Sequence, residues 1–176
     1  MLTIEEIVED CQTLMRGANP PQAVAGYLAQ LLRDLPDELA PLLGDGTDSV
    51  VLHQAGNLTV VKLVLPPQYE LYPHNHLMWA AVATVVGRED NTFFVHEGDR
   101  LERVSGAAYE EGQVGVLPET VIHAVRNPSR AHTVGLHVYG GNLMAAAASE
   151  WDPETFTEHP HAGLGGLGPL GRTAFR

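Results

Sequence analysis

The sequence contains little cysteine and little positive charge. Cys11 is the only cysteine, so an intrachain disulfide is excluded and a reducing compartment is expected. Ten Lys and Arg residues stand against 22 Asp and Glu residues, the formal net charge is −12, and no basic cluster exceeds two neighbours. These charges argue against nucleic acid and anionic membranes as partners.

Long apolar runs are also missing. No uninterrupted apolar stretch reaches the length of a membrane span, and no basic segment followed by an apolar one suggests a signal peptide. We therefore expect a soluble protein of the cytoplasm. The 176 residues, of which 44% are hydrophobic and 18% charged, suit one domain with a sizeable core.

Residues 1–47 favour helices. Thr3 and Glu6 have the spacing of a capping box, apolar residues then follow helical spacing, and Pro20 suits the first position of a second helix. We expect this helical segment to pack on the rest of the domain.

Residues 48–142 predict an all-β barrel. Short runs rich in Val, Leu, Thr and aromatic residues recur between turn residues, which is typical of a sandwich or barrel. No long helix interrupts them, so a parallel α/β sheet is not expected. The predicted strands are 49–53, 58–65, 79–86, 92–95, 101–105, 112–117, 124–126 and 133–139.

Residues 143–176 form a C-terminal extension in this interpretation. Residues 143–148 favour a helical turn, and 151–155 a second, capped turn. The Gly-rich stretch 162–176 has no clear period, which leaves two alternatives: a flexible tail, or an extended arm packed on a neighbour.

Two histidines, His74 and His76, stand two residues apart beside an apolar run. Alternate side chains of a strand share a face, so both imidazoles point the same way and can share a metal ion. Taken alone, the pair has an equal alternative as two solvated loop histidines.

A second segment, 112–127, keeps the spacing of the second cupin motif, G-x5-P-x-G-x2-H-x3-N. Gly112, Pro118, His123 and Asn127 occupy fixed positions of that motif, and Thr120 replaces its inner Gly. Because three neutral imidazoles leave coordination positions open, they indicate a catalytic rather than a structural metal site. The two segments together predict a cupin, a double-stranded β-helix or jelly-roll barrel, with an N-terminal helical segment and with metal ligands His74, His76 and His123.

The first cupin motif is met only in part. Gly87 fits its closing glycine, but the carboxylate expected about four residues after His76 is missing, because 78–81 read Met-Trp-Ala-Ala. A neutral ligand set leaves the ion its full charge, which favours an anionic ligand such as a thiolate.

A third group lies on the predicted strand 133–139. Strand parity puts Gly135, His137 and Tyr139 on one face. If that face points toward the metal, His137 can hold the Tyr139 hydroxyl near the open coordination positions, where a phenol can exchange a proton with a bound ligand. The alternative is a buried strand whose polar tips are satisfied by neighbours.

These residues resemble the cysteine dioxygenase-like cupins, and most closely their bacterial branch of predicted metal-dependent double-stranded β-helix enzymes. The resemblance implies mononuclear iron(II) at the three histidines. The family's Ser-x-His-x-Tyr run falls on Gly135, His137 and Tyr139, so its serine is absent here. The cysteine that some members crosslink to the tyrosine falls near Ala81, which excludes that thioether. The segments that carry the likeness are 73–80, 87–94, 116–127, 136–141 and 151–155.

The resemblance further implies oxidation of a small thiol, of the cysteine or 3-mercaptopropionate type, to its sulfinic acid with molecular oxygen. Tyr139 and His137 would be the catalytic residues. The alternatives are another metal-dependent cupin oxygenase or isomerase on the same site, and a non-catalytic cupin that binds a small ligand.

The cation for a substrate carboxylate is not identified by the resemblance. Members that bind amino-acid carboxylates use an Arg on an early strand, and residues 49–53 contain none. Arg88, Arg126 and Lys62 are candidates, although solvated surface positions are the simpler interpretation for the two arginines. The oligomeric state also stays open, with a homodimer through strand edges as one option.

The other histidines carry weaker signals. His159 and His161 imitate the His-x-His pair but lie in a Pro-bounded terminal segment, and we do not expect them to bind metal. His53, His96 and His132 fall at predicted strand ends or turns and are expected to be solvated.

Overall fold

The computed structural model describes residues 1–161 and 172–173, except 45 and 99. Three helices come first: α1 (Ile4–Leu14), α2 (Pro20–Asp34) and α3 (Pro36–Leu43). The predicted capping box is present, because the Thr3 hydroxyl accepts from the Glu6 backbone N–H and the Glu6 carboxylate accepts from the Thr3 backbone N–H. Prolines begin both α2 and α3, where the missing N–H costs no helical hydrogen bond.

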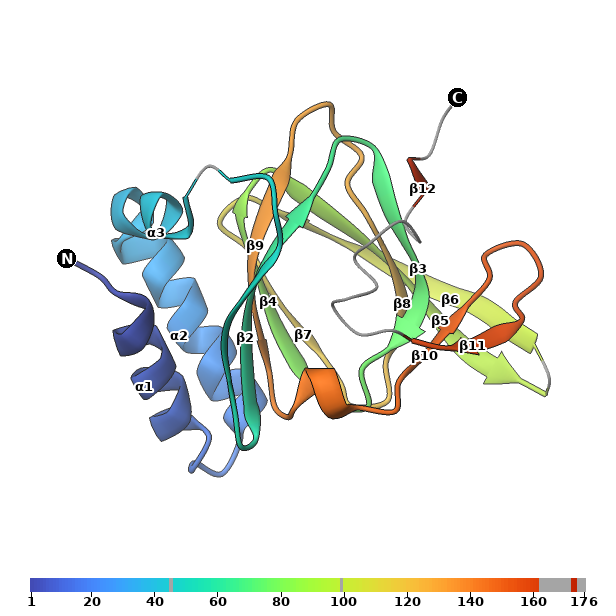
Figure 1. The fold of residues 1–176 in the computed structure, drawn as a ribbon, viewed down its shortest axis with the longest axis horizontal. Helices are drawn as coiled ribbons and strands as arrows, with labels where there is room; N and C mark the ends of the chain where they lie inside the picture. Colours follow the sequence, from blue (N-terminus) through green and yellow to red (C-terminus); the bar gives the residue numbers. More distant parts are fainter. Residues whose placement is uncertain (45, 99, 162–171, 174–176) are drawn as a thin grey trace.

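The strands form two antiparallel sheets that face each other (Figure 1). One sheet has the order β1-β2-β9-β4-β7, and the other has the order β11-β10-β3-β8-β5-β6, with β12 also paired to β3. From β2 to β9 consecutive strands switch sheets, except for the β5–β6 hairpin. This is the jelly-roll topology of the double-stranded β-helix, so the predicted cupin fold class is confirmed. The strands are β1 (Val50–Ala55), β2 (Leu58–Leu65), β3 (Tyr69–Asn75), β4 (Ala80–Val86), β5 (Arg88–Glu97), β6 (Arg100–Glu110), β7 (Val114–Leu117), β8 (Ile122–Arg126), β9 (Thr133–Tyr139), β10 (Ser149–Trp151), β11 (Glu158–Pro160) and β12 (Arg172–Thr173).

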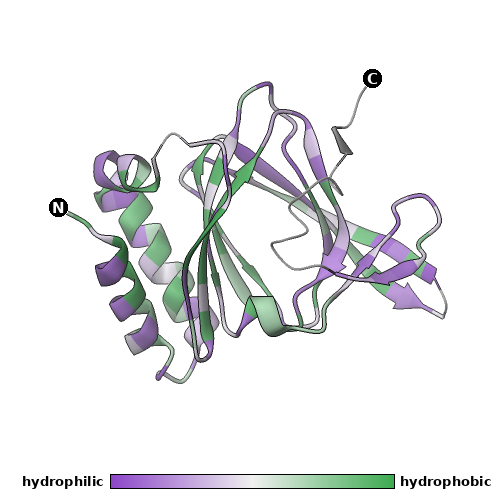
Figure 2. Cartoon of the chain, viewed as in Figure 1, coloured by the Kyte–Doolittle hydropathy of each residue, from purple (hydrophilic) through white to green (hydrophobic). Residues whose placement is uncertain are grey.

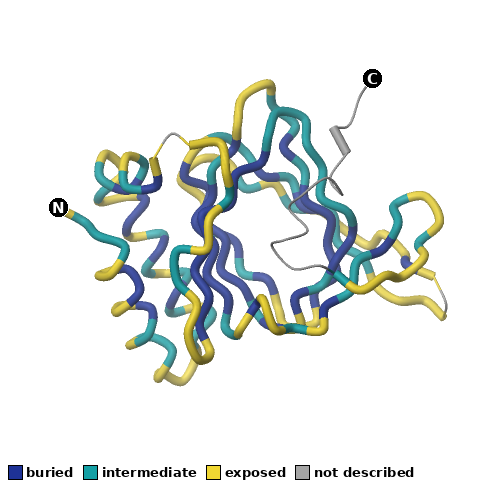
Figure 3. The backbone as a smooth tube through the Cα atoms, viewed as in Figure 1, coloured by how far each residue is buried: buried dark blue, intermediate teal, exposed yellow. Residues whose placement is uncertain are grey.

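The central strands β2, β9 and β4 of the first sheet are buried on both faces, as the dark strands between the helices and the second sheet indicate in Figure 3. Val60 and Leu136 on its outer face pack with Leu28 of α2, and the three helices cover this face. Val61 on its inner face packs with Val125 of the opposite sheet. Figure 2 shows the corresponding green apolar surfaces on the helices and strands. Because side chains are closely packed on both sides of this sheet, its strands are held in fixed positions. Residues on its inner face are therefore held rigidly.

The list of predicted strands left out β3 and shortened β5 and β6, although His74 and His76 were placed on a strand; β3 ends at Asn75, so only His74 lies on it. β3 is half-buried, polar and interrupted by Pro73, whereas the predicted strands were runs of Val and Leu. Proline within a sheet is tolerated at irregularities, and the pairing of β3 with β8 shifts register between Leu71 and His74. The predicted strands 92–95 and 101–105 are parts of a longer hairpin; the residues of β5 that the prediction left out are polar, and they are buried or half-buried before 92.

The C-terminal extension begins with a short 3-10 helix at Leu143–Ala145, where a helical turn is predicted. The Asp152 carboxylate then accepts from the backbone N–H groups of Glu154 and Thr155, as a capped turn requires. Strands β10 and β11 flank that turn, and the sequence did not predict them. Of the Gly-rich stretch 162–176, only the two residues of β12 lie within the described residues, and they pair with β3.

Within residues 1–161 and 172–173, with 45 and 99 left aside, no helix combines the length and the apolar character needed to cross a membrane.

Candidate metal centre

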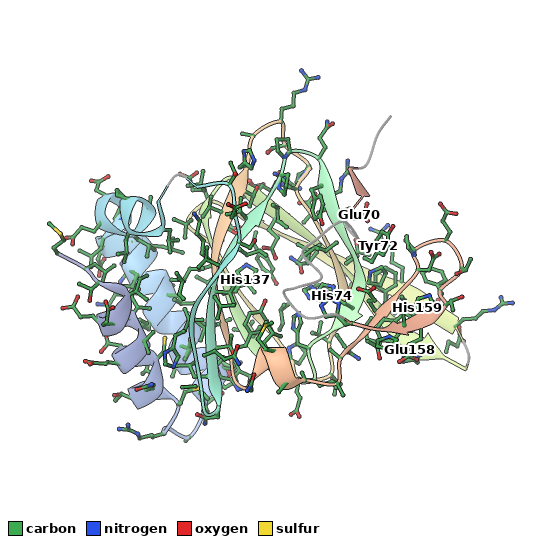
Figure 4. All side chains as sticks on the ribbon, in the orientation of Figure 1. Glu70, Tyr72, His74, His137, Glu158 and His159 are labelled. Carbon is green, nitrogen blue, oxygen red and sulfur yellow. The ribbon has the colours of Figure 1, made fainter. Side chains whose placement is uncertain are left out.

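The three predicted ligand histidines meet between the two sheets. His74 lies on β3 and is directly paired with His123 on β8, while His76 follows the end of β3. Leu77, the next residue, adopts the left-handed conformation with φ of +57°, which a leucine rarely does. The turn comes directly after His76, whose ring lies against the other two with centroids 5.1 Å and 4.9 Å away. In Figure 4, His74 points into the space between the sheets.

The Nε2 atoms of these imidazoles are close together. Nε2 of His76 lies 3.2 Å from Nε2 of His74 and 3.1 Å from Nε2 of His123, and the three side chains offer ligand nitrogens within 4.8 Å of one another. Two nitrogens bound at right angles to one ion, each about 2.1 Å from it, are about 3 Å apart. Both Nε2–Nε2 separations fit that geometry, so the cluster can hold a metal ion.

The other ring nitrogens fix two of the three imidazoles. Nδ1 of His74 donates to the Tyr72 carbonyl at 2.8 Å, and Nδ1 of His123 donates to the Asn91 side-chain oxygen at 2.6 Å. Each bond leaves Nε2 without a hydrogen and turned toward the cluster centre, the usual support of a metal-binding histidine. Nδ1 of His76 is buried and has no hydrogen-bond partner within the described part of the chain.

Burial keeps the cluster uncharged. It lowers the pKa of His74 from 6.5 to about 4. It also holds the pKa values of His76 and His123 well below 6.5, with neighbouring imidazoles adding to the effect. Neutral imidazole is the form that binds a metal ion. The donor set therefore fits iron(II), as the sequence resemblance implies, and equally fits other divalent metals that accept imidazole.

Tyr139 and His137 stand on β9, in the opposite sheet. Their face of β9 points inward, because Tyr139 packs in the core between the sheets. The Tyr139 ring lies edge-on to His76, with ring centroids 5.1 Å apart, and its hydroxyl is 3.4 Å from Nδ1 of His137. Burial raises the pKa of Tyr139, so the phenol keeps its proton. The structure thus brings together all five residues that the sequence predicts for the site.

Two further polar residues, Glu89 and Asn91 on β5, complete the site and were missed. Both are buried, with exposures of 2% and 3%. The Asn91 amide donates to Glu89 Oε1 at 2.9 Å, and Glu89 Oε2 lies 3.2 Å from Nε2 of His137. Burial alone would raise the pKa of Glu89, but His137 and Asn91 lower it by more, so the carboxylate is ionised. The sequence signal for these two residues was the strand spacing of the polar positions 89 and 91. It was missed because the strand was predicted to begin only at 92.

Glu89 refines the predicted neutral site. Within the described residues, the group with converging ligand atoms consists of the three histidines, without a carboxylate. A buried negative charge nevertheless stands behind that group and touches it through Asn91.

The three candidate cations for a substrate carboxylate lie elsewhere. Lys62 faces away from the space between the sheets, and its ammonium donates to the carbonyls of Gly46 and Gly44. Side chains alternate along β8, so Arg126 is on the same face as Ala124 and on the opposite face from His123. Arg126 therefore lies on the outer face of the second sheet. Arg88 lies on that outer face as well, paired with Asp90 at 2.6 Å and with Glu110.

His161 lies closer to the site than the sequence predicted. Its ring stacks on His74 with centroids 5.3 Å apart, and its Nδ1 lies 2.9 Å from the Glu150 carboxylate. It does not belong to the converging group of three. His159 on β11 is exposed and also stays outside that group, as Figure 4 shows. His96 and His132 are exposed as expected, whereas His53 is half-buried.

Comparison with known proteins gives likeness to solved structures alone. No protein-family model matches the chain, and no curated protein matches it. Oxalate decarboxylase from Bacillus subtilis is 21% identical with a TM-score of 0.42, over 49% of this chain but only 22% of the decarboxylase. An RmlC-like cupin from Methanocaldococcus jannaschii is 18% identical with a TM-score of 0.44, over 56% of this chain and 85% of that protein. A double-stranded β-helix protein from Klebsiella pneumoniae subsp. pneumoniae is 14% identical with a TM-score of 0.47, over 60% and 84% of the two chains.

Proposed function

We propose that this protein is an iron(II)-dependent thiol dioxygenase that oxidises a small thiol to its sulfinic acid. The observation that carries the proposal is the convergence of the Nε2 atoms of three buried, neutral histidines, with the Tyr139 ring against one of them. A three-nitrogen set leaves coordination positions for a thiolate and for oxygen. The reaction balances as one thiol and one O2 giving one sulfinic acid: the sulfur loses four electrons, which both oxygen atoms gain.

The residues of the chain have separate tasks in this proposal. His74, His76 and His123 hold iron(II), which supplies the redox chemistry between oxygen and the thiol. His137 holds the Tyr139 phenol, which is neutral and therefore able to donate to or share a proton with a reactant beside His76. All five side chains are at most 7% exposed, so bulk water is kept from the reacting groups.

The substrate is a small thiol of the cysteine or 3-mercaptopropionate type. Its carboxylate would not meet Lys62, Arg88 or Arg126, because each of these lies on an outer face of a sheet. Among the described residues, the buried site residues include an acid, Glu89, and no lysine or arginine. A thiol without a carboxylate, such as cysteamine, therefore belongs in the same test.

An oxygen-electrode assay of the iron-loaded protein tests this function. Cysteine, 3-mercaptopropionate and cysteamine are each supplied, and oxygen uptake is compared with sulfinic acid formed. We expect one sulfinic acid for each O2 consumed with at least one thiol. Oxygen uptake that yields disulfide alone, or ligand binding without uptake, would reject a dioxygenase and favour an oxidase or a binding module.

A further inference from the structure

A continuous chain of polar contacts joins the metal cluster to Tyr139. It runs from Nδ1 of His123 to the Asn91 oxygen at 2.6 Å, from the Asn91 amide to Glu89 at 2.9 Å, and from Glu89 to Nε2 of His137 at 3.2 Å. From Nδ1 of His137 it continues to the Tyr139 hydroxyl at 3.4 Å. This series of contacts starts on β8 and β5 of one sheet and ends on β9 of the other. Glu89 is the residue that connects the two sheets in this series.

Gly135 has a steric part in this arrangement. A Cβ atom at Gly135 would lie 2.7 Å from Nε2 of His137 and 2.9 Å from Cδ2 of the same ring. Any larger side chain at this position would push the imidazole away from Glu89. The family that this sequence resembles has a serine at the position of Gly135. Here the glycine leaves room for the His137 ring, which lies beside the Glu89 carboxylate and has no serine hydroxyl next to it.

We propose that Glu89 is a positioning residue that orients both the metal ligand His123 and the tyrosine Tyr139. A carboxylate can only accept hydrogen bonds, so each neighbour must present a donor to it. Asn91 then presents its amide to Glu89 and its oxygen to His123, which puts the His123 hydrogen on Nδ1 and leaves Nε2 bare for metal. His137 places Nε2 3.2 Å from Glu89 Oε2, although the ring is not aligned for a hydrogen bond there. With its hydrogen on Nε2, facing the carboxylate, His137 leaves Nδ1 to accept from the Tyr139 hydroxyl.

One acceptor therefore sets the direction of every bond along the chain. Reversing any member would place two donors or two acceptors face to face in a buried setting, where each unsatisfied group is destabilising. The inference rests on metal binding by the three histidines in the proposed function, but it does not depend on which thiol is the substrate.

The test replaces Glu89 by glutamine and follows the histidine nitrogens by 15N NMR in the metal-free, full-length protein. Glutamine keeps the shape of Glu89 but brings a donor, so it cannot accept from both Asn91 and His137. We expect the hydrogen of His137 or of His123 to move to the other ring nitrogen in Glu89→Gln. The control Glu97→Gln, on the exposed end of the same strand, should leave both rings unchanged. Unchanged tautomers in Glu89→Gln, or a wild-type His137 that carries its hydrogen on Nδ1, would overturn the proposal.

Zinc binding and kinetics give two further readouts. Loss of the support of a metal-binding histidine weakens metal affinity by about 10- to 100-fold, so Glu89→Gln should bind Zn(II) that much more weakly than Glu97→Gln. In the iron-loaded enzyme, Glu89→Gln should lower kcat by a larger factor in a Tyr139 background than in a Tyr139→Phe background, where only its effect through His123 remains. Full additivity of the two substitutions, or unchanged Zn(II) affinity, would contradict the role given to Glu89.

A second variant covers the case that Glu89→Gln does not fold. Gly135→Ser leaves the carboxylate intact but places a Cβ against His137, so it should change the His137 NMR signals and leave Zn(II) affinity as in the wild type. A wild-type His137 spectrum in this variant would show that the ring does not lie against Gly135, and would overturn the ring position on which the contact with Glu89 depends. If no thiol supports oxygen uptake, the dioxygenase proposal fails alone, because the NMR and Zn(II) results decide the role of Glu89 without it.

Discussion

His74 and His123 occupy directly paired positions on the neighbouring antiparallel strands β3 and β8. Paired residues on antiparallel strands point to the same face of a sheet, so their imidazoles are side by side although they are far apart in the sequence. The sheet thus supplies two of the three predicted ligands at a fixed spacing, and the turn at Leu77 adds His76. The metal ion does not need to gather these side chains from a flexible loop.

The first prediction concerns His76, whose Nε2 lies 3.2 Å from Nε2 of His74 and 3.1 Å from Nε2 of His123. His76→Ala should lose stoichiometric iron and keep the fold, because two nitrogens hold an ion far less well than three and the barrel packs without this ring. Iron is measured by elemental analysis and the fold by circular dichroism, with His132→Ala, an exposed position, as the control. Full iron occupancy in His76→Ala would remove this residue from the ligand set.

The second prediction concerns the Tyr139 hydroxyl. Tyr139→Phe removes one oxygen from a ring whose packing stays, so iron content should be unchanged while kcat falls by about 100-fold, the lower end of what a positioned proton donor contributes. Tyr27→Phe on α2 removes a hydroxyl far from the site and should turn over normally. Equal turnover by wild type and Tyr139→Phe would show that the phenol has no part in the reaction.

The sequence revealed the three histidines of the candidate metal centre but not the residues that orient their rings. His74, His76 and His123 stand in short motifs whose turn residues are their close neighbours, so local spacing was enough to find them. Parity along one strand was likewise enough to put His137 and Tyr139 on one face, and the structure shows that this face points inward. The contacts of Glu89 and Asn91 depend on the register of β5 with β8 and on the approach of β5 to β9 across the barrel. A single sequence does not contain patterns that predict either one.

His161 is instructive for the same reason. The position of His161 over His74 depends on the pairing of β10 with β3 and of β11 with β10. Both pairings are short, and no local sequence pattern predicted them. β3 itself was hidden, because its polar residues and Pro73 do not look like those of a core strand. In both cases tertiary pairing, and not local propensity, determines the structure.

The third prediction concerns Asn91, which connects His123 to Glu89. Asn91→Ala leaves the Nδ1–H of His123 and one oxygen of Glu89 without their partner, so the free energy of unfolding should fall by about 1–3 kcal/mol. Metal affinity should fall by about 10- to 100-fold, because the His123 ring is no longer fixed. Urea denaturation and Zn(II) titration measure the two effects, with Asn57→Ala in the exposed turn between β1 and β2 as the control. Zn(II) affinity equal to the wild type would mean that His123 keeps its orientation unaided.

The fourth prediction concerns acid and the metal-free protein. Burial lowers the pKa of His74 from 6.5 to about 4, so between these values the unfolded chain binds a proton that the folded protein does not. Stability therefore rises with pH across this window and is lost as pH falls from 6.5 toward 4, with a contribution from His74 on the order of 3 kcal/mol. The pKa values of His76 and His123 are lowered in the same direction and steepen the loss. Urea denaturation at a series of pH values measures it: His74→Asn should flatten the curve between pH 6.5 and 4, and His132→Asn should not. A curve for His74→Asn as steep as that of the wild type would mean that His74 takes up its proton in the folded protein as readily as in the unfolded chain.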